Sequence, residues 1–520
     1  MIFKKRTALT LNALLLGACA SLPEAPATLA TVSADDHQLI LSRAGVATVI
    51  HEAESEIEAV AGNGRQLLWI EDAEAALWAG ELGDQRLGAN KLANLDHDAD
   101  GLCFAPVAPG VFDVLISDGD GRVFQYWLDW ASQSLRPVRS LHTNPDIEQC
   151  LLTANELLLN DPYLGPVRAD RNPESDAILQ PLAAPLTAAQ QSQLDSGSYL
   201  MFADTLHGMP EPEVPGVHAD RETTPVQGPG DAADDPAILT AADGNFWVVG
   251  TDKKRGLAVY SADGELRHFL PEGRENNVDA LPLGDDRFLL AASNRTHKSI
   301  DLFMADMQAD SIALTQRIPV SLEDPYGLCM GRNATGQPLV FIGDSEGRVE
   351  YWRLEGDKAS KRRDFDFDSQ TEGCVYDARR HLLYVGQEDR GIWQIDPESG
   401  ERRLIESIEQ GHLVADVEGL DIYDGEQRWL IASSQGDDSY VVYELDPWRY
   451  VAKFRIVPDY ARGIDGVSET DGLAVSTAAL TGYPKGVLVV QDGRNRAPAA
   501  PQNFKLVDWR QIEALLNAAP

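Results

Sequence analysis

An internal repeat at a nearly fixed offset limits the folds that this chain can adopt. The tripeptide Gly-Leu-Cys at 101–103 recurs at 327–329, and ISDGDGRV at 116–123 recurs as IGDSEGRV at 342–349. The offset is 226 residues in both cases, and a third match lies at an offset of 224 residues. Matches in this order and at this spacing indicate two copies of one architecture.

The second copy has the pattern of many short β-strands. Apolar runs such as 246–250 and 339–343 alternate with turns rich in Gly and Asp, such as 262–264. Short strands with frequent turn signals are typical of a sandwich, a barrel or a propeller. Six strand clusters share the 295 residues after Pro225, and a four-stranded propeller blade takes ~40–50 residues. The sequence therefore predicts an all-β chain whose residues 230–520 form a six-bladed β-propeller.

The first copy spans residues 30–200 and is too short for six blades. We expect an incomplete propeller-like β domain there. Between the two copies, five prolines fall within 209–229. This composition is typical of an extended linker, which we place at 205–229.

The N-terminal nineteen residues resemble a bacterial export signal. A basic stretch at 4–6 precedes an apolar stretch at 8–16, which is too short to span a bilayer. Cys19 follows Leu-Gly-Ala directly, as in the lipobox of lipoproteins, so residues 1–19 are predicted to be a lipoprotein signal with lipidation at Cys19. The alternative is an ordinary export signal with an incidental cysteine. We expect an exported lipoprotein that is attached only through its lipid to the outer membrane of a Gram-negative bacterium.

The chain is strongly acidic. Its 520 residues include 82 Asp and Glu against 44 Lys and Arg, which gives a net charge of −38. A surface of this charge repels phosphate backbones and argues against nucleic acid as a partner. It suits an extracellular protein or one that collects cations.

The second copy resembles the β-propeller phytases along its whole length. The resemblance rests on short motifs in the family's order, of which the first is GDAADDPAI at 230–238. The others are DKKRGLAVY at 252–260, NNVD at 276–279, ASNR at 292–295, YG at 326–327, QTEG at 370–373, ED at 388–389, DVEGL at 416–420, SSQG at 433–436, TDG at 470–472, QDG at 491–493 and QNFK at 502–505. Each motif alone is a weak signal, and the resemblance is supported by the occurrence of all of them in the family's order.

The resemblance implies a calcium-dependent phosphomonoester hydrolase, a 3-phytase, that releases phosphate and lower inositol phosphates from phytate (myo-inositol hexakisphosphate). It implies several Ca²⁺ ions as cofactors and calcium complexes of inositol phosphates as substrates. The residue types agree, because Ca²⁺ takes 6–8 oxygen ligands and propeller loops can gather carboxylates around one axis. Bound cations also let an acidic protein hold a polyanion. We expect a monomer.

Carried over residue by residue, the resemblance implies three groups of site residues. The ligands of a catalytic calcium cluster would be Asp234, Glu372, Glu388, Glu418 and Asp471, with Asp416 and Gln435 at accessory positions. The ligands of structural calcium sites would be Asp235, Asp465 and Asn495. The contacts to substrate phosphate, which with Glu388 make up the catalytic residues, would be Lys253, Lys254, Arg295 and Tyr326. Outside this ordered series, an isolated Asp is usually a turn residue and a lysine pair a solvated strand edge.

One position departs from the family pattern. Ser345 stands before Glu346 and Gly347, where the family commonly has a phosphate-binding lysine. Serine can donate a hydrogen bond but has no charge, so the substitution bears on substrate affinity.

The first copy has lost more of the pattern. Pro162 and Tyr163 align with Glu388 and Asp389 of the second copy, so we expect a non-catalytic domain with an auxiliary role in substrate capture. The segment 96–107 starts like an EF-hand loop but ends in Val rather than Glu. An Asp-rich turn is therefore favoured there over a calcium site.

Two other functions agree with an acidic propeller. A Ca²⁺-dependent lactonase or arylesterase would use acidic loops but would not need Lys253, Lys254 and Arg295 together. A surface propeller could bind polyanions or other partners without turnover. Phosphate release from phytate that requires Ca²⁺ separates the three.

Four cysteines remain besides Cys19, and the repeat suggests how they pair. Cys103 and Cys150 lie 47 residues apart, and Cys329 and Cys374 lie 45 residues apart, about one blade in each case. Equal placement in two diverged copies predicts the disulfides Cys103–Cys150 and Cys329–Cys374, since only this pairing keeps both bonds inside a copy with matching geometry. The alternative is four buried free thiols.

Overall fold

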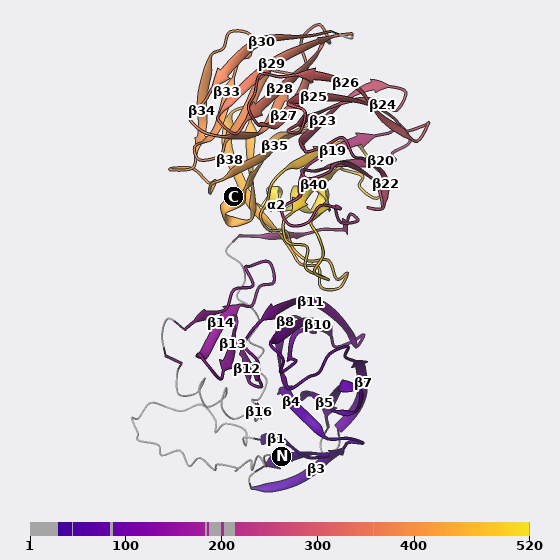
Figure 1. Ribbon diagram of the computed structural model, residues 1–520, viewed down its shortest axis with the longest axis vertical. Helices are drawn as coiled ribbons and strands as arrows, with labels where there is room; N and C mark the ends of the chain where they lie inside the picture. The colour runs from indigo at the N-terminus through magenta and orange to yellow at the C-terminus, as the bar shows by residue number, and fades with distance from the viewer. Residues whose placement is uncertain are drawn as a thin grey trace.

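The computed structural model describes residues 30–518 except 44, 84–86, 183–184, 187–198, 202–213 and 357. The predicted lipoprotein signal and Cys19 lie outside these residues. The described chain is mostly β-strand and forms two units, which Figure 1 shows one above the other. Its helices, within these ranges, are α2 (Trp509–Ala518) and the 3₁₀ turns η1 (Ala73–Ala75) and η2 (Gln435–Asp437). No helix of the described chain has the length and apolar character needed to cross a membrane.

The C-terminal unit contains six sheets within the described residues, and their consecutive strands pair antiparallel. Four of them consist of four consecutive strands each. The first has β19 (Ala233–Thr240), β20 (Phe246–Asp252), β21 (Gly256–Ser261) and β22 (Leu266–Leu270), and the second has β23 (Glu275–Gly284), β24 (Arg287–Asn294), β25 (Ser299–Asp306) and β26 (Ser311–Pro319). The third has β27 (Pro325–Arg332), β28 (Pro338–Asp344), β29 (Arg348–Glu355) and β30 (Lys358–Asp366), and the fourth has β31 (Thr371–Asp377), β32 (Leu382–Gln387), β33 (Gly391–Ile395) and β34 (Arg402–Ser407). The other two contain β35 (Val417–Asp424), β36 (Arg428–Ser434), β37 (Ser439–Leu445) and β38 (Trp448–Val457), and β39 (Leu473–Ser476), β40 (Val487–Asp492) and β41 (Asn503–Asp508).

The first strands of these sheets form a closed ring. Contacts run from β19 to β23, β27, β31, β35 and β39 in turn, and β39 contacts β19 again. Sheets arranged in this way around one axis are the blades of a β-propeller. The fold agrees with the all-β propeller predicted from the spacing of strands.

Two short strands before the ring complete the last two sheets. Strand β17 (Gly216–His218) pairs in parallel with β38, and β18 (Arg221–Glu222) pairs with β41. The described part of the predicted linker at 205–229 therefore belongs to the propeller, and the C-terminal unit begins before residue 230. Strands from opposite ends of the unit hold its ring closed.

The core of the propeller lies between the blades. Six clusters of buried apolar side chains each join two neighbouring sheets, and one of them also includes Trp509 and Ile512 of α2. Strand β20 is buried at every position, because both faces of its sheet are covered by neighbouring blades. This explains why the central strands appear in the sequence as continuous apolar runs rather than as alternating ones.

The N-terminal unit has four sheets in the described residues. The first has β1 (Ala30–Asp35), β2 (Gln38–Arg43), β3 (Val46–Glu52) and β16 (Tyr199–Met201), and the second has β4 (Ile57–Asn63), β5 (Gln66–Glu71), β6 (Ala76–Leu82) and β7 (Leu87–Asn94). The third has β8 (Gly101–Ala108), β9 (Val111–Ser117), β10 (Arg122–Asp129) and β11 (Ser134–His142), and the fourth has β12 (Cys150–Leu152), β13 (Glu156–Asp161), β14 (Gly165–Asp170) and β15 (Gln180–Pro181). Their first strands contact in the order β1, β4, β8 and β12. This part of the chain has the blade architecture of the C-terminal unit with fewer blades.

The cysteines are paired as the repeat predicts. Cys103 and Cys150 join β8 to β12 with Cα atoms 6.0 Å apart, and Cys329 and Cys374 join β27 to β31 with Cα atoms 5.6 Å apart. Each bond therefore connects the first strands of two neighbouring sheets. Residues 101–107 of the EF-hand-like segment 96–107 lie in β8, so the helix that would follow an EF-hand loop is not formed there.

Candidate metal and phosphate site

The first strands of five blades share an irregularity that places the polar side chains. Strands β19, β23, β27, β31 and β35 each lose register with the neighbouring strand over two residues near their N-terminal ends. Such bulges redirect side chains and are common beside functional sites. The residues within these breaks are Asp234 and Asp235, Asn276 and Asn277, Tyr326 and Gly327, Glu372 and Gly373, and Glu418 and Gly419.

Glycine follows several of these side chains because neighbouring first strands approach closely. A Cβ on Gly327 would lie 1.9 Å from the carbonyl oxygen of Glu372, and one on Gly373 would lie 1.9 Å from that of Glu418. A Cβ on Gly472 would lie 2.4 Å from Oδ1 of Asp235. The paired motif of a polar residue and glycine is therefore a steric requirement of the narrow ring.

Of these side chains, Tyr326, Glu372 and Glu418 line a cavity of about 610 Å³. Its walls include seven carboxylates, namely Asp231, Glu372, Glu388, Asp416, Glu418, Glu469 and Asp471. Its other charged or amide-bearing side chains are Lys253, Gln370, Gln435, Gln491, Arg494, Asn495, Arg496 and Gln502, and Tyr326 also lines it. The cavity is thus polar and dominated by acids.

Three carboxylates form the tightest group. One oxygen atom from each of Glu372, Glu388 and Glu418 lies within 4.8 Å of the other two. Burial, followed by repulsion from Glu418 and Asp234, raises the pKa of Glu372 well above its ordinary value. Burial, and to a smaller extent repulsion from Asp416, raises the pKa of Glu388 to about 7. The protein alone therefore disfavours several negative charges at this place.

The donor set fits a cation of the calcium type. Asp234 Oδ1, Glu388 Oε1 and Glu418 Oε2 are buried and have no hydrogen-bond partner among the described residues. Unpaired buried acceptors are rare and call for a ligand. Oxygen atoms bound at 2.3–2.6 Å to one Ca²⁺ can be about 5 Å apart, which suits the spacing of the three glutamates.

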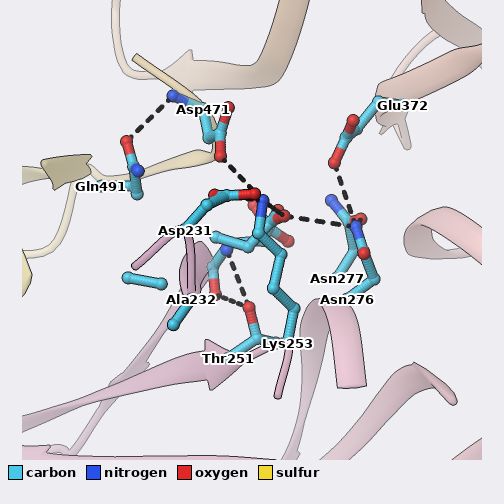
Figure 2. Close-up of polar contacts among 12 residues, drawn as sticks. Asp231, Ala232, Thr251, Lys253, Asn276, Asn277, Glu372, Asp471 and Gln491 are labelled. Carbon is cyan, nitrogen blue, oxygen red and sulfur yellow. Dashed lines mark hydrogen bonds and ion pairs between the residues drawn. The ribbon is translucent and has the colours of Figure 1, made fainter. Parts of the chain in front are cut away.

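Lys253 is held among the acids (Figure 2). Its ammonium lies 2.8 Å from Asp231, 3.2 Å from Asp234 and 3.4 Å from Asp471. Burial alone would lower the pKa of Lys253, but the charges of Asp234 and Asp471 outweigh it and raise that pKa. The lysine is therefore a fixed cation at the cavity wall.

Asn276 connects two of the predicted metal ligands. Its side-chain amide donates to Glu372 Oε1 at 3.0 Å and to Asp234 Oδ2 at 3.3 Å. It also accepts from Arg295 Nη1 at 3.2 Å. Asn276 lies in one of the motifs of the resemblance, but it received no role from the sequence.

The four predicted phosphate contacts are placed differently. Lys253 and Tyr326 line the cavity, whereas Lys254 is exposed and does not. Arg295 is not among the lining residues, and its guanidinium lies 4.7 Å from the centroid of the Tyr326 ring and 2.9 Å from Asp324 through Nε. Ser345, at the position of the usual lysine, lies between β28 and β29 and does not line the cavity.

The predicted accessory ligands lie at the cavity as well. Asp416 and Gln435 both line it, and Gln435 Nε2 donates to Asp471 Oδ1 at 2.5 Å. Backbone contacts also join these elements, since the amide of Gln435 donates to the carbonyl of Asp416 at 3.0 Å.

The three residues predicted for structural calcium sites do not meet at one place in the cavity wall. Asp235 accepts from the amide of Val278 at 3.0 Å. Asp465 is fully buried and pairs with the ammonium of Lys505, which is also 3.1 Å from Asp492. Only Asn495 of the three lines the cavity, and its amide donates to the carbonyl of Pro501 at 3.0 Å.

Several cavity residues were missed by the sequence analysis. Asp231 stands inside the first motif but received no role there. Arg494 and Arg496 flank Asn495 and have no sequence signal of their own. Their significance depends on contacts with distant parts of the chain.

The fold and the site together define a β-propeller with a carboxylate-rich cavity suited to a metal ion. The profile of the family described as Phytase matches residues 186–520. Over 331 residues the chain is 36% identical to the 3-phytase of Bacillus subtilis (strain 168), with 58% of this chain and 86% of that protein covered. The chain belongs to the Phytase family.

Proposed function

We propose that this protein is a 3-phytase that hydrolyses phosphomonoesters of phytate in a calcium-dependent reaction. The principal support is the acidic cluster beside Lys253, in a chain of the Phytase family. Phytate carries several phosphate groups, so its binding to a strongly acidic protein requires cations between the two.

The proposed cation ligands are Asp234, Glu372, Glu388, Glu418 and Asp471. Calcium bound there supplies positive charge that stabilises the transferring phosphoryl group. The number of ions and the accessory roles of Asp416 and Gln435 belong to the same proposal, as do the structural sites at Asp235, Asp465 and Asn495.

The chain's own cations orient the phosphate. The ammonium of Lys253 is fixed by three carboxylates and faces the cavity, so it can form a charge-assisted hydrogen bond with little loss of side-chain freedom. Arg295 packs on the ring of Tyr326 and holds that side chain at the wall. Burial, and to a smaller extent the negative charges of Glu372 and Asp234, raises the pKa of Tyr326. Its hydroxyl therefore stays protonated and can donate to a phosphate oxygen.

The test is phosphate release from phytate by the full chain with Ca²⁺ and with EDTA. We expect release only with Ca²⁺, and loss of release in Glu388→Gln. A lactone and an aryl ester are assayed in parallel. Turnover of either without phosphate release from phytate would favour the lactonase or arylesterase alternative, and no turnover of any substrate would favour a binding protein.

Export and membrane attachment through Cys19 are a separate proposal, supported by the basic and apolar stretches before it. Labelled fatty acid should be incorporated into the wild-type chain and not into Cys19→Ser. We also propose that the N-terminal unit is non-catalytic and that the protein is a monomer, which light scattering after size-exclusion chromatography would test.

A further inference from the structure

The N-terminal unit packs on the propeller beside the cavity. The ring of Trp127 lies edge-on to Tyr460 with centroids 4.8 Å apart, and Tyr460 joins a small apolar cluster with Val111, Trp127 and Val138. The amide of Ala499 donates to the carbonyl of Val138 at 3.0 Å. These contacts join β9, β10 and β11 of the N-terminal unit to two propeller loops.

Glu174 crosses this interface as a buried carboxylate. It follows β14 and is 6% exposed. Its two oxygen atoms accept from the amide of Gly466 at 3.2 Å and from the hydroxyl of Ser468 at 3.0 Å. The N-terminal unit is therefore fixed to the loop that ends at Asp471, a predicted metal ligand.

The same segment of the N-terminal unit holds a cation at the cavity wall. Arg494 lines the cavity, and its Nη1 donates to the carbonyl of Glu174 at 2.8 Å. Its Nη2 donates to Asp176 Oδ1 at 2.9 Å and also to Glu469. These contacts use three of the five N–H groups of a guanidinium, and 18% of the side chain is exposed.

Arg496 supplies a second guanidinium to the same wall. Its backbone amide donates to Asp465, which anchors the loop, while the side-chain Nε is buried without a hydrogen-bond partner among the described residues. A buried N–H donor without a partner is unfavourable. Arg496 also lines the cavity, where an anion would compensate the charge of its guanidinium.

Among the described residues, the basic side chains that line the cavity are Lys253, Arg494 and Arg496. Lys253 is bound by three carboxylates at the acidic cluster. The two arginines belong to a different loop, between β40 and β41, which the N-terminal unit contacts. They are suited to a phosphate other than the one that Lys253 faces.

We propose that Arg494 and Arg496 form a second phosphate-binding subsite on the cavity wall, and that the N-terminal unit positions Arg494 for it through residues 174–176. The substrate side of this proposal rests on the proposed phytase function. It assigns the N-terminal unit a direct part in substrate binding, as a support for one wall of the cavity.

Binding of myo-inositol hexakissulfate, which the enzyme cannot hydrolyse by phosphate release, tests the subsite separately from catalysis. Titration calorimetry with Ca²⁺ present should show about tenfold or more weaker binding for Arg494→Ala and for Arg496→Ala, because each variant loses a charge-assisted hydrogen bond. The control is Arg449→Ala, since Arg449 is exposed and pairs with Glu444 outside the cavity. Unchanged binding by both cavity variants would overturn the proposal, even if phytate is hydrolysed.

Kinetics with phytate test the same subsite in the reaction. Arg494→Ala should raise KM about tenfold, with little change in kcat and in the inhibition constant of inorganic phosphate, which has no second phosphate to place. A fall in kcat with unchanged KM would contradict a binding role. A wild-type chain that releases no phosphate would refute the proposed function and leave the calorimetric result as the measure of the subsite.

A double-mutant cycle tests the role of the N-terminal unit. Asp176 is 68% exposed at its side chain, so Asp176→Ala should fold normally. We expect it to weaken binding of the hexakissulfate about threefold, in the range of a single exposed charge contact, and to have no further effect in the Arg494→Ala background. Equal effects of Asp176→Ala in the two backgrounds would overturn the positioning role.

Discussion

Lys253 and Asp471 are 218 residues apart in the sequence, yet the ammonium of one lies 3.4 Å from the carboxylate of the other at the cavity wall. The contact joins the first blade of the ring to the last. It also compensates part of the negative charge that the first strands bring together.

Replacement of this lysine should affect both stability and turnover. Lys253→Ala leaves Asp234 and Asp471 buried without their cation, and loss of one partner from a buried pair costs about 3–5 kcal/mol. We expect a lower melting temperature in EDTA and a fall of about 10²-fold in kcat/KM for phytate, a typical effect of removing one stabilising donor. The exposed neighbour provides the control, since Lys254→Ala should leave the melting temperature unchanged. Equal melting curves for the two variants would refute the structural part of this prediction.

Glu388→Gln should remove most of the activity while the fold is kept. Glu388 is half-buried at the cavity and its Oε1 has no hydrogen-bond partner among the described residues, so the amide replaces a charge without breaking a packed contact. We expect kcat to fall by about 10²-fold or more at saturating Ca²⁺, measured as phosphate release. Asp389→Asn, at the exposed adjacent residue, should retain activity. Near-normal turnover by Glu388→Gln would show that this carboxylate is not a ligand of the catalytic metal.

The acidic part of the site could be predicted because its signals are local. Glu372, Glu418 and Asp471 each precede a glycine whose Cβ would collide with a neighbouring strand, as with Gly373 and the carbonyl of Glu418. Short motifs therefore record both the chemistry and the packing of the ring. The pairs Cys103–Cys150 and Cys329–Cys374 could be predicted for a similar reason, since the repeat fixes their positions on neighbouring blades.

The basic part depends on contacts that no local pattern encodes. Arg494 meets Glu174 and Asp176, which precede it by 320 and 318 residues. Strands β17 and β18 have only three and two residues, too few to show a period. The prolines of their segment predicted a linker, although pairing with β38 and β41 makes the segment part of the propeller.

The stabilising effect of calcium should increase with pH. In the metal-free protein burial raises the pKa of Glu388 to about 7, and burial with repulsion raises that of Glu418 well above 4.5. A raised carboxyl pKa means that the metal-free fold binds protons that the unfolded chain has released. The stability that these bound protons contribute is fully present below about pH 4.5 and is lost as the pH rises through about 7.

The difference in melting temperature between Ca²⁺ and EDTA should therefore be larger at pH 8 than at pH 5.5. A ligand at a hundred times its Kd adds about 2.7 kcal/mol to the free energy of unfolding, and protons compete with it at low pH. The half-buried Asp279 and Asp421, whose pKa values burial raises to about 6 and about 7, do not line the cavity and affect both conditions alike. An equal concentration of Na⁺ should not replace Ca²⁺. A difference that stays constant over this pH range would argue against a carboxylate-bound metal.

The disulfide of the propeller should support the site more than that of the N-terminal unit. Cys329 lies three residues after Tyr326 and Cys374 two residues after Glu372, so the bond ties together two strands that supply the cavity. A bond that closes a loop of 45 residues stabilises by about 4 kcal/mol in the chain-entropy model. Replacement of both cysteines by serine should lower the melting temperature of the propeller and reduce kcat for phytate.

The matched variant replaces Cys103 and Cys150, whose bond closes a loop of 47 residues in the N-terminal unit. Its loss of stability should be similar in size, about 4 kcal/mol, because the two loops are nearly equal in length. Its kcat should stay near that of the wild type, since neither cysteine lies on a strand that lines the cavity. KM should rise only if the unit unfolds and releases Arg494 from Glu174. Melting by calorimetry, with kinetics below the first transition, separates these effects. Equal losses of kcat in the two double variants would show that the Cys329–Cys374 bond has no particular role in positioning the site.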